Sequence, residues 1–430
     1  MAQSQTFTPR LALEYASRYN DNLLISPAQK KEDFSEVLSP GVGFLYGQPQ
    51  RTYISLDYLA ELERFNSFRE FDANNEYVKL DTQAKFDRLT MRLMHSFHDV
   101  AGPNSEISMW ARERRNETTL NSEYRLNSKT SMGLDCRQLF NDYVTTGMVN
   151  SRKFIVGGTL YYHLFPKTDL LGQFNHGWVN VQSGANAVYE EVNVGFRGQL
   201  TGKIVGIAKV GYQHREFDLA TVATLNEPVA AIDLEAKLTD RISVNIEVAR
   251  DIEPSGSQLN DSYSKTDLSL AGHYRLFRSV TLSAGGLYSD HDYKKEYAGY
   301  VLTCFDAWVG VNYEMTKWLQ LGAYYRYEMR SMRLSARGSR TLSVYTCASA
   351  IKSHHPSKKN AHIQSFIDAE ACRSKRQGAI FFMAPVAVVD RVGDDLLYDF
   401  ADRNPTGVSH WLGSSRRRCP GGRRIPHSPI

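Results

Sequence analysis

The feature that most constrains the fold is a repeat of about 38 residues in the middle of the chain. "EYRLNSKTSMGLD" at 123–135 and "YYHLFPKTDLLGQF" at 161–174 share a tyrosine, an apolar anchor two positions later, a short polar stretch and a second apolar series. The pattern occurs six times, and successive anchors are separated by 38, 36, 38, 38 and 39 residues. Such even spacing predicts an array of similar supersecondary units over residues 120–330. The anchors are Leu126, Leu164, Leu200, Leu238, Leu276 and Met315.

Each unit has the pattern of a β-hairpin. Residues 242–248, for example, alternate Ile, Val, Ile and Val with Ser, Asn and Glu. A period of two predicts a strand whose two faces meet different environments. A few polar residues follow each anchor, and such stretches favour a tight reversal. Longer polar segments such as 251–265 then link one hairpin to the next.

The length of these strands indicates a membrane protein. The alternation persists for about 9–13 residues, whereas strands of soluble proteins usually have about 5–6. About 9–11 tilted residues are needed to cross the hydrocarbon layer of a bilayer. A β-propeller has a similar repeat length, but each blade needs four short strands. The sequence therefore predicts an all-β fold: a transmembrane antiparallel β-barrel of about 16–18 strands, followed by an irregular C-terminal tail.

The N-terminal third shows the same architecture less regularly. We expect a first strand at 10–19, a hairpin about 47–50 and a further turn near 82–86. With the six repeats this gives seventeen strands by residue 330, and because single-chain bacterial barrels have even numbers, one more should follow. Only 340–351 offers a weak alternation there. The short turns are expected at one rim, near 48, 84, 128, 166, 202, 240, 278 and 317.

Aromatic residues are placed regularly relative to the turns. A tyrosine precedes four of the six anchors by two positions, and Phe165, Phe277 and Trp318 lie in or beside turns. Tyr and Trp favour the membrane–water boundary and form girdles there in barrels. We therefore expect an aromatic girdle at the short-turn rim. The four tyrosines are Tyr124, Tyr162, Tyr274 and Tyr313.

From about residue 331 the 38-residue repeat and the two-residue alternation end, and tyrosines become rare. Residues 331–430 hold 16 Lys or Arg against 7 Asp or Glu, whereas residues 1–330 hold 35 against 40. We expect a barrel over 8–351, its last strand the weakest part, and an irregular basic tail over 352–430. A shift of reading frame near 331 is favoured over an appended basic domain, because the break falls one strand short of closure. No secretory signal is visible at the start, so we expect a mature sequence given an initiator Met.

The sequence carries no recognisable catalytic motif. It has no Gly-rich phosphate loop, no G-x-S-x-G and no H-E-x-x-H. His95 and His98 fall on opposite faces of one strand, which argues against a shared metal. We expect no catalytic residue, no cofactor, no metal and no nucleic-acid partner.

Function should then depend on the inner face of the barrel, which is polar wherever the apolar face meets lipid. Barrels of 16–18 strands leave room for an aqueous channel. A wall of mixed charge favours passage of hydrophilic solutes over steep selection of one ion sign. The alternatives are a non-conducting structural or assembly barrel and, less favoured, an outer-membrane enzyme. The pore-lining candidates are Arg18, Asp57, Glu61, Arg92, Arg137, Asn175, Lys209, Arg215, Asn245, Glu247, Asp306, Asn312, Glu314 and Arg326.

The chain also resembles a known family. "RLALEYASRYNDNLLISPAQKKEDFSEVLSPGVGF" at 10–44 and "RTYISLDYLAELERF" at 51–65 are similar to the start of the bacterial putative β-barrel porin family found with exopolysaccharide loci, and the "LNSKT" and "LFPKT" turns are similar too. The resemblance covers about residues 7–330. It implies a channel or porin of the bacterial outer membrane with no catalytic residues, whose partners are outer-membrane lipid and polysaccharide or small hydrophilic solutes. The solute, the direction of transport, an open or plugged pore and the oligomeric state stay open.

Overall fold

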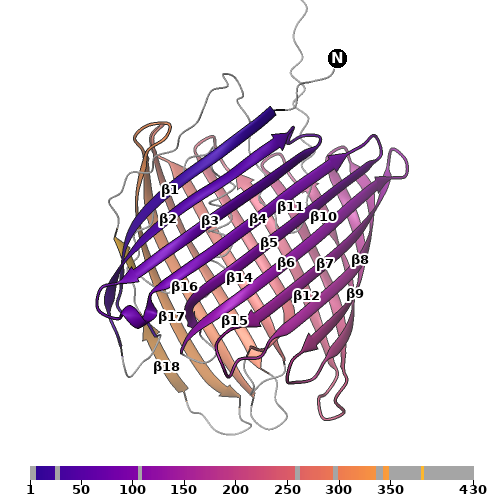
Figure 1. The fold of residues 1–430 in the computed structure, drawn as a ribbon. Helices are drawn as coiled ribbons and strands as arrows, with labels where there is room; N and C mark the ends of the chain where they lie inside the picture. Colours follow the sequence, from indigo (N-terminus) through magenta and orange to yellow (C-terminus); the bar gives the residue numbers. More distant parts are fainter. Residues whose placement is uncertain are drawn as a thin grey trace, which may run out of the picture.

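The computed structural model describes residues 6–24, 30–104, 109–256, 262–293, 299–335, 342–347 and 379–381. It confirms the predicted fold class: seventeen long strands, β1–β17, form one antiparallel sheet that curls into a barrel (Figure 1), each strand pairing with the next along the chain. The described part of the chain contains no helix long and apolar enough to cross a membrane. The long strands are β1 (Thr6–Asn20), β2 (Asp33–Gly47), β3 (Tyr53–Phe65), β4 (Ala73–Lys85), β5 (Leu89–Asn104), β6 (Met109–Arg125), β7 (Thr130–Tyr143), β8 (Ser151–Phe165), β9 (Thr168–Val181), β10 (Ala187–Gln199), β11 (Ile204–Phe217), β12 (Leu225–Lys237), β13 (Ile242–Pro254), β14 (Ser262–Arg275), β15 (Val280–Tyr293), β16 (Gly299–Glu314) and β17 (Gln320–Ser335).

Eight short connections lie together at one end of the barrel, the short-turn rim, at the top of Figure 1. They occupy residues 48–52, 86–88, 126–129, 166–167, 200–203, 238–241, 276–279 and 315–319. The turn predicted near 84 lies slightly later, because Lys85 still pairs with Thr90 in the sheet. The other connections form the opposite end, the long-loop rim, and include a single turn of 3-10 helix, η1 (Arg69–Phe71).

Polar side chains just after four of the six anchors stabilise the short turns. The Oγ1 atoms of Thr201, Thr239 and Thr316 each accept backbone N–H groups from the residues two and three positions later, at 2.9–3.3 Å. The Oδ1 atom of Asn127 accepts the equivalent two bonds at 2.8 and 2.9 Å. A short polar side chain at this position satisfies the backbone of the tight reversal, which is why Thr and Asn favour such turns.

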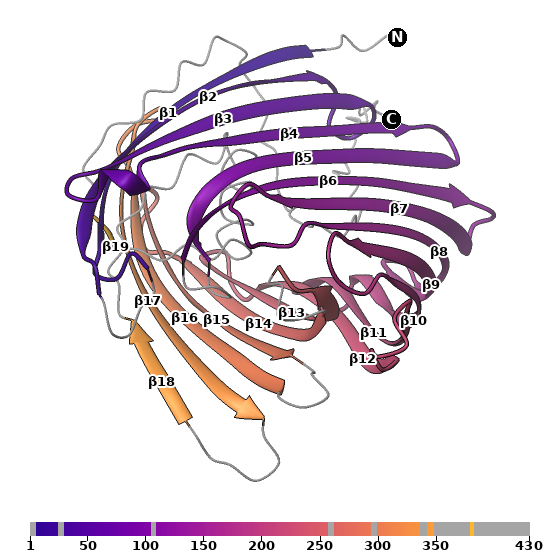
Figure 2. The same cartoon turned by 60° about the horizontal axis from the view of Figure 1, so that its bottom comes forward.

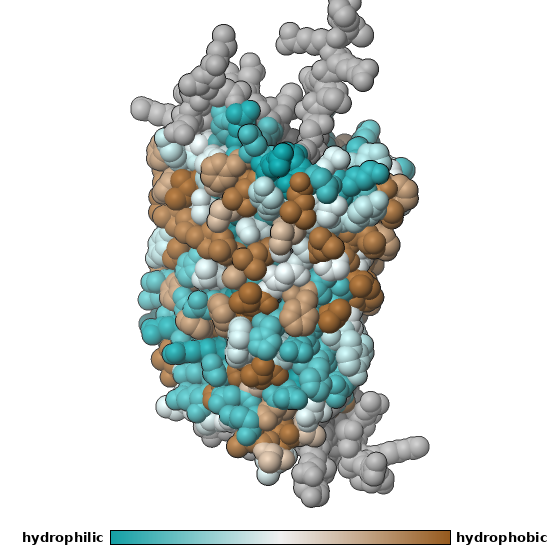
Figure 3. All heavy atoms as spheres, turned by 90° about the vertical axis from the view of Figure 1, so that its right-hand side faces the viewer, coloured by the Kyte–Doolittle hydropathy of each residue, from teal (hydrophilic) through white to brown (hydrophobic). Residues whose placement is uncertain are grey.

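The strands are longer than the alternation predicted. β1–β17 have 13–17 residues each, against the expected 9–13. On the face shown in Figure 3, hydrophobic residues gather in the upper half and hydrophilic residues predominate below. Along β8, Leu160 and Tyr162 are exposed near the short-turn rim, whereas exposed Arg152 lies near the long-loop rim. The strands thus continue past the apolar band towards the long-loop rim, where polar outward side chains such as Arg152 stand among apolar ones such as Phe154 and the alternation in hydropathy fades.

The expected aromatic girdle is present at the short-turn rim. The outward side chains of Tyr124, Tyr162, Tyr274 and Tyr313 are 38–44% exposed. Aromatic side chains in the turns themselves, such as Phe277, are more exposed still. This placement suits rings that meet headgroups on one side and water on the other.

Two short strands lie where the barrel closes. β18 (Leu342–Cys347) pairs antiparallel with β17 between Glu328 and Arg333, inside the range 340–351 where a last strand was predicted. β19 (Ala379–Phe381) pairs antiparallel with β1 between Ser17 and Tyr19. Among the described strands, no ladder joins β18 to β19 or β17 to β1, so the closure is incomplete (Figure 2).

Most of the predicted basic tail, 352–430, lies outside the described residues, which include only 379–381 of it. The barrel boundary at 351 and the irregular tail therefore stay predictions.

Candidate functional site

The candidate site is the interior of the barrel, whose polarity is inverted relative to a soluble protein. On β3, Ile54 and Tyr58 point outward and are exposed, while Ser55, Asp57 and Glu61 point inward and are buried. Successive strand residues face opposite sides, so one alternation builds both surfaces. The same arrangement of apolar outside and polar inside is that of transmembrane barrels.

On the wall formed by β1–β5, charged side chains neutralise one another in pairs. Arg10 lies 2.7 Å from Asp57, and its Nη2 also donates to Ser55. The predicted residues Arg18 and Glu61 form a second pair at 3.0 Å. Arg92 reaches Asp81 at 2.8 Å. The predicted residues Arg18, Asp57, Glu61 and Arg92 therefore all belong to ion pairs. Two of these pairs join β1 to β3 past β2, and the third joins the adjacent strands β4 and β5.

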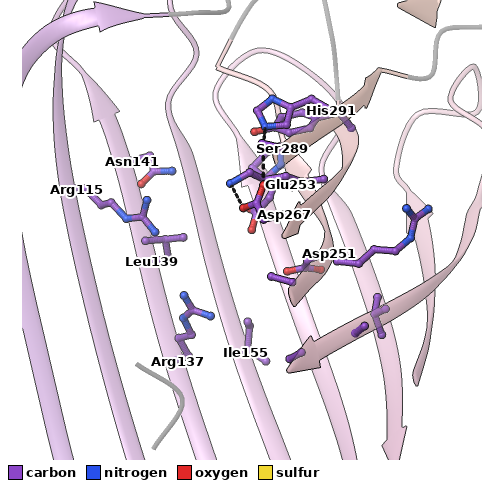
Figure 4. A pocket seen from close by; sticks show the side chains of 18 of the residues that line it. Arg115, Arg137, Leu139, Asn141, Ile155, Asp251, Glu253, Asp267, Ser289 and His291 are labelled. Carbon is purple, nitrogen blue, oxygen red and sulfur yellow. Dashed lines mark hydrogen bonds and ion pairs between the residues drawn. The ribbon is translucent and has the colours of Figure 1, made fainter. Parts of the chain in front are cut away.

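A cavity of about 520 Å³ lies inside the barrel between β5 and β17. Figure 4 shows Arg115 and Arg137 on one side of it, with Asp251, Glu253 and Asp267 on the other. Both signs of charge therefore face the same space. Five of the predicted pore-lining residues line this cavity: Arg137, Asn175, Lys209, Asp306 and Arg326.

Each side of the cavity also carries the opposite charge. Arg137 and Arg115 share Glu117, at 2.7 and 3.5 Å. Across the cavity, Asp267 contacts Lys265 at 2.7 Å. Both walls of the cavity thus carry charges of both signs.

The other predicted residues lie elsewhere on the inner face. Arg215 is buried, and its Nη2 donates to the carbonyl oxygen of Ile252 at 2.8 Å. Asn312 donates from Nδ2 to Gln320 at 3.5 Å. Asn245 and Glu247 share the face of β13 that carries Asp251, and Glu314 shares the face of β16 that carries Asp306, by the alternation of each strand. The role of the predicted residues in a pore stays a prediction.

The wall turns a corner at β8–β11 (Figure 2), and each of these strands carries one inward glycine. A Cβ atom on Gly177 would lie 2.3 Å from the ring of Tyr189, and one on Gly157 would lie 2.2 Å from Oδ1 of Asn175. Side chains from neighbouring strands therefore occupy the space that a larger residue would need. Glycine allows this close approach at a corner of a curved sheet. The four glycines are Gly157, Gly177, Gly195 and Gly211.

Contacts that cross this corner were missed from the sequence. Lys153 on β8 reaches Asp251 on β13 at 3.0 Å, and Arg197 on β10 reaches Glu123 on β6 at 2.8 Å. Lys153 could have been found, because two-residue steps along β8 place it on the face of Gly157. Its neighbour on that face, Ile155, is apolar, so the polar inner face of β8 is not evident from the alternation. Contacts between strands that are not adjacent have no local signature in the sequence.

A serine, a histidine and an aspartate meet on β14 and β15, as Figure 4 shows, but not as a hydrolase requires. Ser289 Oγ donates to Asp267 Oδ1 at 2.5 Å and lies 2.9 Å from His291 Nε2. In a catalytic triad the histidine lies between serine and aspartate and takes the serine proton. Here the serine lies in the middle and donates its hydrogen bond to the aspartate, so the cluster does not have the order of a catalytic triad. Among the described residues, no group of three or more His, Cys, Asp and Glu is placed to hold a metal ion.

Comparison with known proteins connects the barrel with porins. The family model described as "Putative beta-barrel porin 2" matches residues 173–349, from within β9 to just past β18. The resemblance to this family, first noted on the N-terminal motifs and the turns, is thereby confirmed. The chain is an outer-membrane type of β-barrel with porin features. No curated protein matches the chain.

Several solved outer-membrane barrels overlap with the chain. They include the ferric citrate transporter FecA (11% identity, 80% of this chain and 62% of that chain, TM-score 0.39). The apoprotein form of the FrpB iron transporter of Neisseria meningitidis gives 8% identity, 78% and 63% coverage and a TM-score of 0.44. The outer-membrane protein opdK of Pseudomonas aeruginosa has 10% sequence identity and a TM-score of 0.39, and the match covers 80% of this chain and 95% of that chain. The chain spans less than two thirds of the two iron transporters, and at TM-scores below 0.5 these overlaps say nothing about what the chain carries.

Proposed function

We propose that this chain forms a water-filled channel for small hydrophilic solutes in the bacterial outer membrane. The observation that carries the proposal is the cavity of about 520 Å³ inside the barrel, whose walls bear charges of both signs. A barrel of this strand number is wide enough to leave an aqueous lumen. The match to a porin family over 173–349 supports the same function.

The charges of the cavity predict its selectivity. Rings of one sign are what give a pore steep selection of ions. Here Arg137 lies beside Glu117, and Asp267 lies beside Lys265. We therefore expect weak preference between cations and anions and free passage of neutral polar solutes.

The experiment is a swelling assay with proteoliposomes that contain the folded chain. Uncharged sugars of increasing size are added outside, and the rate of swelling is followed by light scattering. We expect swelling with small sugars and a progressive loss as the sugar grows. Swelling no faster than that of liposomes without protein would contradict the proposal.

The second candidate is a non-conducting structural barrel. The contacts Lys153–Asp251 and Arg197–Glu123 favour it, because they cross the interior between strands that are not neighbours. A folded barrel that gives no swelling and no ion current would point to this function.

The resemblance to porins found with exopolysaccharide loci adds a role in polysaccharide export to the proposal. A polysaccharide that uses the channel should enter the cavity and block the ion current while it occupies it. Single-channel recordings with polysaccharide fragments added to one side and then to the other measure this block. An unchanged current at every fragment length would remove polysaccharide from the proposal.

A further inference from the structure

One lysine ties together two parts of the barrel wall that are far apart along the sheet. Lys153 lies on β8 near the long-loop rim, and only 5% of its side chain is exposed. Its Nζ atom lies 3.0 Å from Asp251 Oδ2 and 3.9 Å from Glu253 Oε1, both on β13. Four strands, β9–β12, separate β8 from β13 in the sheet. The bridge therefore spans the interior instead of joining neighbouring strands.

The corner formed by the glycines of β8–β11 lets an aromatic ring pack beside Lys153. Because Gly177 has no side chain, the ring of Tyr189 occupies the space beside it. The Lys153 Nζ atom lies 5.5 Å from the centre of this ring, and the Arg215 guanidinium lies 4.9 Å from it. Both cations thus lie near the same aromatic ring, whose π-face attracts positive charge. From there each reaches β13, Lys153 through Asp251 and Arg215 through the carbonyl of Ile252.

Further contacts hold β13 at the same level. Gln213 donates from Nε2 to Asp251 Oδ1 at 3.3 Å. Between the adjoining loops, the backbone N–H of Val149 donates to the carbonyl of Gly256 at 2.9 Å. The ring of Tyr143 fills the space beside Gly256. The end of β13 is therefore drawn towards β7 and β8 across the interior.

Polar side chains behind the bridge line the same cavity as Arg115 and Arg137. Asn175 donates to Glu191 at 3.0 Å, and Lys209 donates to Gln173 at 2.8 Å. Arg115 and Arg137 line the cavity on its other side, and we expect a solute to pass along that wall. The reach of one side chain, from β8 to β13, limits how wide that passage can be.

We propose that Lys153 sets the size limit of the channel by holding β13 across the interior. The inference rests on the proposed channel function and adds the residue that determines which solutes pass. A buried ammonium group requires its carboxylate partners, so removing either side of the bridge removes the ion pair between β8 and β13, while the ladders to β12 and β14 keep β13 in the sheet. The passage then widens into the space behind the bridge.

The experiment compares variants at Lys153 in planar bilayers and in the sugar-swelling assay. Lys153→Met removes the charge and keeps the length of the side chain, whereas Lys153→Arg keeps the charge. Arg152→Met is the matched control, because Arg152 is exposed on the outer face of the same strand. We expect Lys153→Met to raise the single-channel conductance and to admit larger sugars. Lys153→Arg and Arg152→Met should behave like the original chain.

A second variant, Asp251→Asn with Glu253→Gln, breaks the bridge from the other side and keeps the test possible if Lys153→Met does not fold. It should raise the conductance in the same way. Single-channel recording measures only barrels that have inserted into the bilayer. If Lys153 had a merely structural role, its replacement would lower the number of channels and leave the conductance of each channel unchanged. That result would overturn the inference while the channel function stands.

Silence in every form would overturn the channel function and the inference together.

Discussion

Arg197 donates from its two terminal nitrogens to the two carboxylate oxygens of Glu123, at 2.8 Å each, although the residues are 74 positions apart. Its Nε atom donates to Asp169 at 2.8 Å, and its guanidinium stacks 3.4 Å above the ring of Tyr161. The planar fork of arginine suits this geometry, and the compact ammonium of lysine does not. β6, β9 and β10 are thereby joined near the short-turn rim by one side chain.

Arg197→Lys should therefore destabilise the barrel even though the charge is kept. Losing charge-assisted hydrogen bonds typically costs about 1.5–3 kcal/mol, and we expect a fall of this size in the free energy of unfolding. Urea unfolding of the barrel in lipid vesicles, followed by tryptophan fluorescence, measures it. Arg278→Lys, in the exposed turn 276–279, is the control and should change nothing. Equal stability of both variants would show that the two-pronged contact is unimportant.

Gly177→Ala should disturb the corner of the barrel. The added Cβ atom would lie 2.3 Å from the Tyr189 ring, which is packed beneath Lys153 and Arg215. Overpacking of this kind typically costs about 1–3 kcal/mol. Gly172→Ala on the same strand is the matched control, because nothing lies within 4 Å of a Cβ atom there. Replacing Tyr189 with leucine as well should recover part of the loss, and failure to recover any would place the strain elsewhere.

Ile246→Arg should be costly, whereas Asn245→Arg should be tolerated. Ile246 faces lipid opposite Leu270, which is 52% exposed, and Asn245 points to the interior. A charge on the lipid face near the midplane typically costs about 2–4 kcal/mol. Comparing the unfolding free energies of the two variants in vesicles gives the difference directly. Since a slip of one residue reverses a whole strand, equal costs would mean that the register of β13 is wrong.

A chain that ends at residue 351 should still form the barrel. β1–β17 and β18 all lie before this position, and only the three residues of β19 lie beyond it among the described strands. Folded barrels migrate differently from unfolded chains on unheated gels, which gives a simple readout of insertion. If the shortened chain fails to insert while the full chain succeeds, residues after 351 belong to the barrel.

The fold could be predicted from the sequence because its signals are local and repeated. Each hairpin repeats an anchor, a turn residue such as Thr239 and a two-residue alternation, and six copies reinforce one another. The alternation also predicted an inner-face position for Lys209 and Arg326, which line the cavity in the structure. Strand length was underestimated, because the strands extend beyond the apolar band and the alternation in hydropathy fades there.

The interior contacts could not be predicted in the same way. Whether Lys153 meets Asp251 depends on how tightly the wall bends, and that curvature comes from glycines spread over β8–β11. In the sequence, a single glycine in a strand gives no sign of a corner. The corner becomes evident only when the positions of the glycines in adjacent strands are known. The residues that narrow the interior are thus set by tertiary shape, while those that face it are set by the local pattern.

The central claim, that the barrel conducts, is tested most directly by single-channel recording in planar bilayers. Purified, folded chain is added to one side in a salt solution, and the current is measured under voltage and then under a salt gradient. The mixed walls with Arg137 and Glu117 predict discrete steps of current and a reversal potential close to zero under the gradient. Insertion of folded barrels without any current steps would contradict the account.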